Sequence, residues 1–223
     1  MPVSKEIARE KLILAGERLV AMHGIDGLSL RKVNIEAGQK NTSAALYHFG
    51  DKEGLLLAIF DYRMEHVDQR RHQLLDADSS SVRALTRAWI LPDVQEINEA
   101  EGGSYHARFL AVVCNHADFD FDQLWQRPYA SSYLRVADGL RRHLPHLPPD
   151  VFSMRFGMAM IQSIYTMADQ ERIANSAATT FEPNSPALVS HLVDVLEAIF
   201  LAPVSLETEW LMTSPRTAVK RSA

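Results

Sequence analysis

Apolar residues recur at the three- and four-residue spacing of a helix through most of this chain, and alternating β-branched runs are absent from it. Glycine, proline and capping residues interrupt the pattern at intervals. The sequence therefore predicts an all-α fold of about nine helices. We expect these helices at about 4–23, 30–36, 41–49, 51–75, 81–100, 104–116, 120–143, 149–175 and 186–201.

Residues 28–55 have the pattern of a helix-turn-helix. Ser29 can cap a short helix, Ala37-Gly38 makes a tight turn after it, and Asn41 can cap the next helix. Asp51 then caps a long fourth helix. This layout is typical of domains that present a recognition helix to the DNA major groove. The alternative is three short helices at the end of an ordinary bundle.

Prolines and polar stretches mark further boundaries. Pro92 and Pro128 lie inside predicted helices, and each should kink or split its helix because proline lacks a backbone donor. We divide the chain into a three-helix head at 1–50, a helical body at 51–203 and a C-terminal tail at 204–223. The last stretch of the tail is polar and basic, and we expect it to be flexible.

Composition and charge are those of an ordinary globular protein. The chain has 223 residues, of which 47% are apolar, and a single cysteine, Cys114, which suits a reducing compartment. The net charge is -5, but residues 1–56 carry eight Lys/Arg against seven Asp/Glu. The N-terminus lacks the apolar stretch of a signal peptide, and no run approaches the ~18 apolar residues of a membrane span. We expect a cytoplasmic protein with no membrane partner.

The segments SLRKV, EAG and ALYHFGDKEGLL resemble the DNA-binding domain of the TetR family of bacterial transcriptional regulators. The resemblance covers about residues 5–57. This chain has one residue more between Ala37-Gly38 and the following His-Phe than the commonest members, and Leu46 where they place a tyrosine. The resemblance implies a double-stranded DNA operator, a homodimer and a small-molecule effector bound by the helical body.

The resemblance also implies roles for individual residues of the head. Small polar side chains at the start of the recognition helix can reach base edges, and the methyl group of Ala44 can meet a thymine methyl. Phosphates should be held at the edge of the groove and at the start of the fourth helix. The expected base contacts are Lys40, Thr42, Ser43 and Ala44, and the expected phosphate contacts are Ser29, Arg31, Tyr47, His48 and Lys52.

Aromatic and methionine side chains are frequent in the body. For any one of them plain core packing is the simpler interpretation, but buried Tyr and Trp need polar partners, so the group suits an amphipathic cavity. We expect an apolar or aromatic effector with one polar group, either an acyl chain or a hydrophobic xenobiotic. Arg108 could meet an anionic group or lie at the surface. The expected lining is Phe60, Met64, Trp89, Phe109, Trp125, Tyr129, Tyr133 and Met160.

The last two predicted helices of the body suit a dimer element. The helix at 186–201 has two apolar faces, and the helix at 149–175 has small residues that permit close approach of another helix. A two-fold dimer would place its recognition helices about one turn of DNA apart, ~34 Å or a multiple of it, on a near-palindromic operator. The residues expected at the interface are Phe156, Ala159, Ser163, Leu188, Leu192, Val195 and Ile199.

Other chemistry has little support in the sequence. Asp118, Asp120 and Asp122 have the spacing of a calcium loop, but Gln123 and Tyr129 stand where that loop needs Gly and Glu. Cys114 lies in an apolar stretch and is interpreted as a core residue. We expect no metal, no cofactor and no catalytic residue. A ligand-responsive repressor is the leading hypothesis; the alternatives are a regulator without an effector and an all-helical enzyme.

Overall fold

The computed structural model describes residues 2–100, 103–117, 119, 122–174 and 185–213. Within these ranges the chain forms eleven helices and no strand, which confirms the predicted all-α fold. The helices are α1 (Pro2–His23), α2 (Leu30–Glu36), α3 (Ala44–Phe49), α4 (Lys52–Ala77), α5 (Val82–Glu99), α6 (His106–Cys114), α7 (Asp122–Trp125), α8 (Ala130–His143), α9 (Pro149–Ala174), α10 (Pro186–Leu201) and α11 (Leu206–Thr213).

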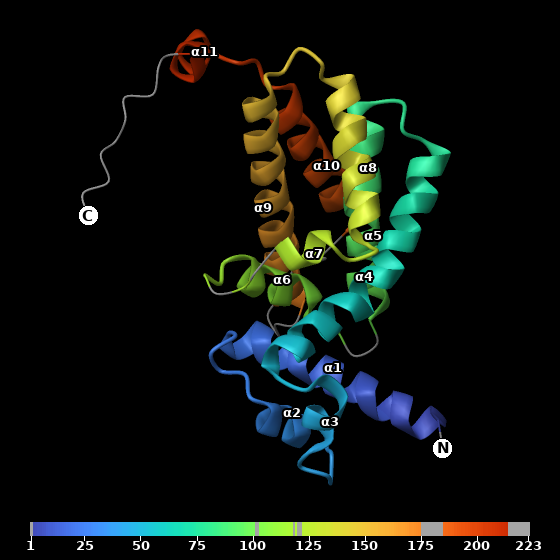
Figure 1. The fold of residues 1–223 in the computed structure, drawn as a ribbon. Coiled ribbons are helices and arrows are strands. Elements are labelled where there is room, and N and C mark those ends of the chain that lie inside the picture. Colours follow the sequence, from blue (N-terminus) through green and yellow to red (C-terminus); the bar gives the residue numbers. More distant parts are fainter. Residues whose placement is uncertain (1, 101–102, 118, 120–121, 175–184, 214–223) are drawn as a thin grey trace, which may run out of the picture.

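Helices α1, α2 and α3 form a head at one end of the molecule (Figure 1). The Ser29 side chain caps α2 by accepting a hydrogen bond from the Lys32 amide, as the sequence predicts. The expectation that Asn41 caps the third helix is wrong, because α3 begins at Ala44. The Asn41 side chain instead accepts a hydrogen bond from the Ser43 amide, 3.0 Å away. This local turn competes with a helix start, as asparagine side chains often do.

Helix α4 leaves the head and runs along the body, where it packs on α5 and α8 (Figure 1). Its N-cap is Asp51, as predicted; the Asp51 carboxylate accepts the Gly54 amide hydrogen bond at 2.8 Å. The first half of α4 belongs to a core shared with the head, and its last buried residue, Leu75, belongs to the core of the body. Helix α4 is therefore common to both parts of the protein.

The body consists mainly of α5, α8, α9 and α10, which pack around buried side chains such as Leu85, Val136 and Leu196. Pro92 lies within α5 without ending it, whereas Pro128 falls in the break between α7 and α8. The expected helix at 120–143 is therefore split, as proline predicts. Helix α10 has the bounds predicted from the Ser185-Pro186 start.

One short helix was not predicted. This is α11, which lies in the segment expected to be a flexible tail. Residues 214–223 of that tail lie outside the described residues, as do Asp118, Asp120 and Pro183. Of the described helices, none alone has the length and hydropathy of a bilayer span. Taken as a pair, α10 and α11 meet that criterion by length and composition only, and the chain bends by 60° between them.

Candidate nucleic-acid interface and ligand cavity

A buried asparagine holds α2 and α3 in their relative position. Asn34 is 2% exposed, and its amide nitrogen donates to the Thr42 carbonyl at 2.7 Å while its side-chain oxygen accepts the Ala45 amide at 2.9 Å. Between the two helices Gly38 has a φ of 64°, a conformation that favours glycine. The longer turn is thus bridged by one side chain. Sequence analysis missed Asn34, although it shares the inward face of α2 with Val33 and Ala37.

The residues before and along α3 form an exposed surface. Lys40, Thr42 and Ser43 are exposed, as base contacts would have to be. Ala44 is not: it is 8% exposed and packs in the core of the head, so the prediction that its methyl group meets a base is wrong. Leu46 is 56% exposed on the same helix. Its exposure on the same surface marks it as a further candidate for contact with DNA.

Polar groups flank this surface. Tyr47 is 70% exposed, and its hydroxyl accepts a hydrogen bond from the Lys5 ammonium group at 3.1 Å. The same ammonium group lies 4.9 Å from the centre of the Tyr47 ring. Lys5 comes from the first turns of α1 and was not predicted, because only the tertiary fold brings it to α3. Ser29 and Arg31 are exposed, and Lys52 is half-buried at the first position of α4.

His48 lies between α3 and the cations of α1. Partial burial, together with the charges of Lys5 and Arg9, lowers the pKa of His48 below its ordinary value of 6.5. The imidazole is therefore neutral in the free protein at neutral pH. A phosphate placed at this surface would offset the two cations and favour the protonated ring.

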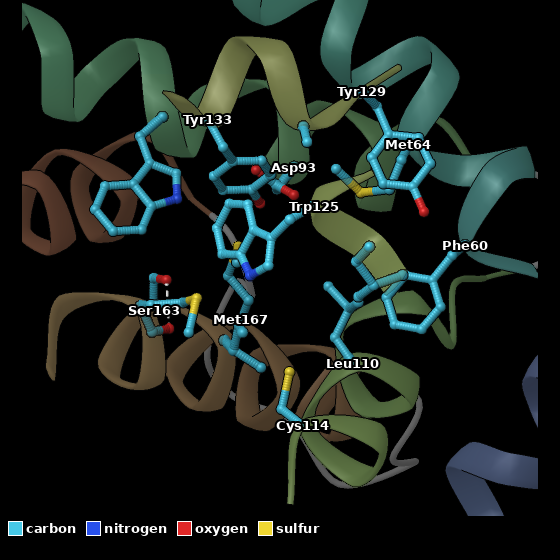
Figure 2. A pocket seen from close by; sticks show the side chains of 15 residues that line it. Phe60, Met64, Asp93, Leu110, Cys114, Trp125, Tyr129, Tyr133, Ser163 and Met167 are labelled. Atoms are coloured by element: carbon cyan, nitrogen blue, oxygen red, sulfur yellow. Dashed lines mark hydrogen bonds between the residues drawn. The ribbon is translucent and has the colours of Figure 1, made fainter. Parts of the chain in front are cut away.

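The body contains a cavity of about 90 Å³. Helices α4 to α9 all contribute to its walls (Figure 2). Most of the side chains expected from the sequence meet there. Phe109 does not line it but packs edge-on against Phe60, 5.1 Å between ring centres. The expected residues that the structure brings together are Phe60, Met64, Trp89, Trp125, Tyr129, Tyr133 and Met160; Asp93, Cys114, Ser163 and Met167 are among those that were missed.

An ion pair lies at one end of the cavity. The Arg71 Nη2 atom donates to Asp93 Oδ2 at 2.8 Å, and Arg71 is fully buried. Its guanidinium group also lies 4.0 Å from the centre of the Tyr133 ring. Burial raises the pKa of Tyr133 and raises that of Cys114 to about 11, so both groups stay protonated at neutral pH. The neutral thiol is that of a packed cysteine rather than a reactive one.

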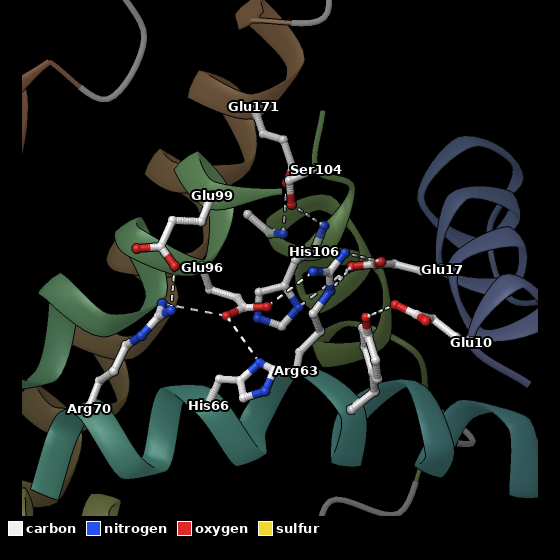
Figure 3. Close-up of polar contacts among 12 residues, drawn as sticks. Glu10, Glu17, Arg63, His66, Arg70, Glu96, Glu99, Ser104, His106 and Glu171 are labelled. Atoms are coloured by element: carbon white, nitrogen blue, oxygen red, sulfur yellow. Dashed lines mark hydrogen bonds and ion pairs between the residues drawn. The ribbon is translucent and has the colours of Figure 1, made fainter. Parts of the chain in front are cut away.

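A second buried charge cluster joins the head to the body (Figure 3). Arg63 of α4 donates to Glu17 of α1, with Nη2 to Oε2 at 2.8 Å, and to Glu96 of α5, with Nη1 to Oε1 at 3.1 Å. Glu17 and Glu96 are 1% and 6% exposed. Burial raises the pKa of Glu17, and the nearby Arg63 charge opposes that rise. The 2.8 Å contact to Arg63 favours the ionised carboxylate. Sequence analysis missed this cluster.

His106 begins α6 beside the same cluster. Its Nδ1 atom lies 3.8 Å from Glu17 Oε1, and both ring nitrogens are buried without a hydrogen bond. Burial, with a smaller contribution from Arg63, lowers the pKa of His106 to about 3. Glu171 of α9 accepts the Arg108 amide at 2.9 Å and so caps this end of α6. Arg108 itself does not line the cavity, since its side chain lies over the Tyr105 ring.

The charge cluster borders a cleft of about 870 Å³ between the head and the body. The cleft is larger than the cavity in the body, but charged side chains such as Arg18, Glu36, Arg70 and Glu99 line much of it. These groups are already paired, as in the contacts of Arg18 with Glu36 and of Arg70 with Glu99. An apolar effector therefore fits the aromatic cavity of the body better than this cleft.

The surface of α9 and α10 differs from the predicted interface. Ala159, Ser163 and Leu192 are buried within the protomer, so these three residues are wrongly assigned to a dimer contact. Phe156 stacks on Trp89 at 4.8 Å but stays partly exposed, and its assignment remains a prediction. Leu188, Val195 and Ile199 remain at least partly exposed. The α9 surface instead exposes a stripe of large apolar side chains that sequence analysis missed: Met154, Met158, Ile161 and Tyr165.

Comparisons with known proteins point to one family. A family profile described as "Tetracyclin repressor-like, C-terminal domain" matches residues 87–198. The HTH-type transcriptional repressor AcnR of Corynebacterium glutamicum is 38% identical over 52 residues, which are 23% of this chain and 27% of that protein. The match therefore spans only about a quarter of that relative.

A solved structure shows the same fold. A chain from Rhodococcus sp., described as a TetR-family transcriptional regulator, aligns with a TM-score of 0.52 and 17% identity over 87% of this chain and 99% of that chain. Another, from Mesorhizobium loti and described in the same way, has a TM-score of 0.48 and 15% identity over 89% of this chain and 96% of its own.

Among the described residues, no group of three His, Cys, Asp or Glu side chains could hold a metal ion.

Proposed function

The chain belongs to the TetR family of transcriptional regulators, and we propose that it is a homodimeric repressor released from its operator by a small aromatic or apolar effector. One observation carries this proposal. Helix α4 lines the cavity with Phe60 and Met64, and between them it carries Arg63, which binds Glu17 of the head. A change in the cavity therefore acts on an element that is bonded directly to the head.

For the DNA contact we propose two groups of residues. The exposed side chains of Lys40, Thr42 and Ser43 would read base edges. Phosphates would be bound by side chains at the rim of this surface, where they fix register without reading sequence. The proposed phosphate contacts are Ser29, Arg31, Tyr47, His48 and Lys52, with Lys5 added because it hydrogen bonds to Tyr47.

For the dimer we propose a two-fold contact through α9 and α10. Met158 and Ile161 of α9 are 60% and 57% exposed, and a stripe of such side chains is typical of a protein interface. Leu188, Val195 and Ile199 of α10 would extend it. A two-fold axis through these helices would present two copies of α3 to half-sites ~34 Å apart, or a multiple of it.

For the effector, differential affinity sets the requirement. A ligand releases DNA only if it binds more tightly to a conformation in which the two heads do not fit the operator than to the conformation that binds DNA. The cavity of about 90 Å³ must enlarge for a drug-sized ligand, since such pockets are ~300–1,000 Å³. Met64, Met160 and Met167 line the cavity, and methionine repacks easily because it is unbranched. We expect these side chains to move first.

The DNA-binding proposal is tested by selecting operators from a randomised duplex pool with the full-length protein. The selected sites should be near-palindromic, and the protein should bind them as a dimer. Tyr47→Ala should weaken binding to specific and random duplexes alike, whereas Thr42→Ala should change the selected sequence. Lys52→Gln should lower the slope of log affinity against log salt by about 0.9 per phosphate lost. A Tyr47→Ala variant that changed only sequence preference would contradict these assignments.

A regulator without an effector is the second candidate, and the small volume of the cavity favours it. The two candidates differ in one result. If the protein is a sensor, apolar aromatic compounds should raise its melting temperature and lower its operator affinity. If the cavity is only a packing defect, compounds that fill it will leave operator binding unchanged. We place either regulator in the cytoplasm with its DNA and propose no catalytic step, since regulators of this family are not enzymes.

A further inference from the structure

The cavity has an uneven distribution of polar groups. Its walls are aromatic rings, methionines and aliphatic side chains (Figure 2). Among the described residues that line it, Asp93 is the one carboxylate, and no Lys, Arg or His side chain lines it. Ser163 donates its hydroxyl proton to the Met160 carbonyl at 2.8 Å, which leaves its oxygen as an acceptor. The charged group in the lining is therefore an acceptor, and no cation lines the cavity to balance an anionic ligand.

Arg71, the cation nearest to this end, is already occupied. Its Nη2 atom donates to Asp93 Oδ2 at 2.8 Å and to the Trp89 carbonyl at 3.3 Å. Its Nε atom also donates to the Trp89 carbonyl, at 3.4 Å, and Nη1 donates to Ser132 Oγ at 3.1 Å. Four of its five donors are thus used. A ligand carboxylate could recruit Arg71 only by leaving Asp93 buried without its partner, which is strongly unfavourable.

Asp93, unlike Arg71, can still bind a ligand group, because Arg71 bonds to one of the two carboxylate oxygens of Asp93. The bond from Arg71 goes to Oδ2, and Oδ1 accepts no hydrogen bond from another side chain in the described part of the chain. Asp93 is 3% exposed and borders the cavity. A carboxylate oxygen has two acceptor positions, so Oδ1 can take a donor from a ligand without loss of the Arg71 pair.

We propose that the effector is an aromatic compound with an N–H or O–H donor directed at Asp93, a protonated amine included, and without a free carboxylate. This inference rests on the proposed effector role of the cavity and narrows it. A donor gains a charge-assisted hydrogen bond to Asp93, and a cationic donor also gains from the rings of Trp89, Trp125 and Tyr133. A carboxylate would face the negative charge of Asp93 with no cation in the lining to offset it. Acyl chains that end in a free carboxylate are thereby excluded.

The test compares four small probes of the same shape on the full-length protein at pH 7.5. They are toluene, benzyl alcohol, benzylamine and benzoate. Binding is followed by melting temperature and by the change in intrinsic tryptophan fluorescence, to which Trp89 and Trp125 of the cavity contribute. We expect benzylamine and benzyl alcohol to bind at least about tenfold more tightly than benzoate, with toluene between them. Benzoate binding as tight as that of benzylamine would overturn the inference.

Two variants assign the effect to this end of the cavity. In Arg71→Met/Asp93→Leu both charges are replaced by apolar groups of similar size, which often preserves folding. This variant should bind toluene at least as well as the wild type and lose the preference for benzylamine over benzoate. Ala130→Phe should fill the cavity and abolish binding of all four probes. An unchanged preference in the double variant, or unchanged binding in Ala130→Phe, would overturn the inference.

The outcomes separate this inference from the proposed function. If none of the four probes binds the wild-type protein, both the effector role and the present inference fail. If the probes bind and benzoate is favoured, the effector role stands and the assignment of a donor ligand to Asp93 fails. Circular dichroism and operator binding of each variant check that its fold is retained.

Discussion

Replacement of Arg63 by Met tests how strongly the head is fixed to the body. The change removes the cation shared by Glu17 and Glu96 and leaves an apolar side chain of similar length. Both carboxylates are then buried without this partner, at 1% and 6% exposure. Removal of one member of a buried pair typically costs about 3–5 kcal/mol. That is a large share of the ~5–15 kcal/mol that stabilises a typical domain.

A matched control exists on the surface of the body. Arg135 forms an ion pair with Asp76 at 2.7 Å, but the two side chains are 43% and 69% exposed. Exposed pairs of this kind contribute about 0–1 kcal/mol. Arg135→Met makes the same chemical change as Arg63→Met, so the difference between the two variants isolates the effect of burial.

Urea unfolding followed by circular dichroism measures the difference. All variants are compared at one protomer concentration, because the stability of a dimer depends on concentration. With a slope of ~2–3 kcal/mol per molar urea, Arg63→Met should lower the midpoint by roughly 1–2.5 M. The double variant Glu17→Gln/Arg63→Met should be less destabilised than the sum of its single changes, since one stranded charge is gone. If Arg63→Met were no more destabilising than Arg135→Met, the cluster would not join head to body as argued.

Three further predictions concern other buried or exposed groups. Asn34→Ala should lower stability by about 1–3 kcal/mol in urea unfolding, because the Ala45 amide and the Thr42 carbonyl lose their partner; a change below 0.5 kcal/mol would contradict its bridging role. Met158→Glu should shift the protein from dimer to monomer in sedimentation velocity and weaken operator binding, and a dimer of unchanged affinity would exclude this face as the contact. His106 has a pKa lowered from 6.5 to about 3, so on acidification the unfolded chain takes up this proton first. From pH 7.5 to 5.5 this group should therefore remove about 1.4 kcal/mol of stability, and His106→Gln should show a correspondingly smaller loss; an equal loss in both proteins would refute the assignment.

Local patterns predicted the elements whose boundaries depend on nearby residues. Ser29 and Asp51 cap α2 and α4 as expected, because a cap uses donors within the next three residues. Helix α10 begins at Pro186, with Ser185 as its cap, for the same reason. Asn41 misled the prediction, since its side chain serves a turn at Ser43 and not a helix start. An asparagine side chain can accept an amide hydrogen bond two residues later in a turn or two to three residues later as a helix cap. The local sequence does not show which of these two structures Asn41 forms.

The pattern of apolar and polar positions could not predict contacts between residues that are distant in the sequence. Glu17, Arg63 and Glu96 lie on three helices, and each resembles an ordinary surface charge in its own segment. Some residues of the predicted dimer interface were wrongly assigned for a related reason. Ala159 and Leu192 belong to apolar stripes with helical spacing, but such a stripe does not reveal whether it faces its own protomer or a partner. The aromatic cavity was better predicted, because the cluster of Trp, Tyr and Met itself indicated a partly polar enclosure.

The geometry of α4 limits how a ligand could move the head. Met64, which lines the cavity, and Arg63, which binds the head, are consecutive residues, so a displacement of α4 by a ligand moves both. Breakage of the Arg63 pairs would cost more than the ~1–3 kcal/mol typical of allosteric coupling. The Arg63 contact to Glu17 should therefore persist, and α1 should move together with α4. Glu96 of α5 also lies 3.8 Å from His66 and 3.6 Å from Arg70, which follow Arg63 on successive turns of α4. We expect α4 to slide along α5 with Glu96 always paired, so that the head swings as one piece with its helix.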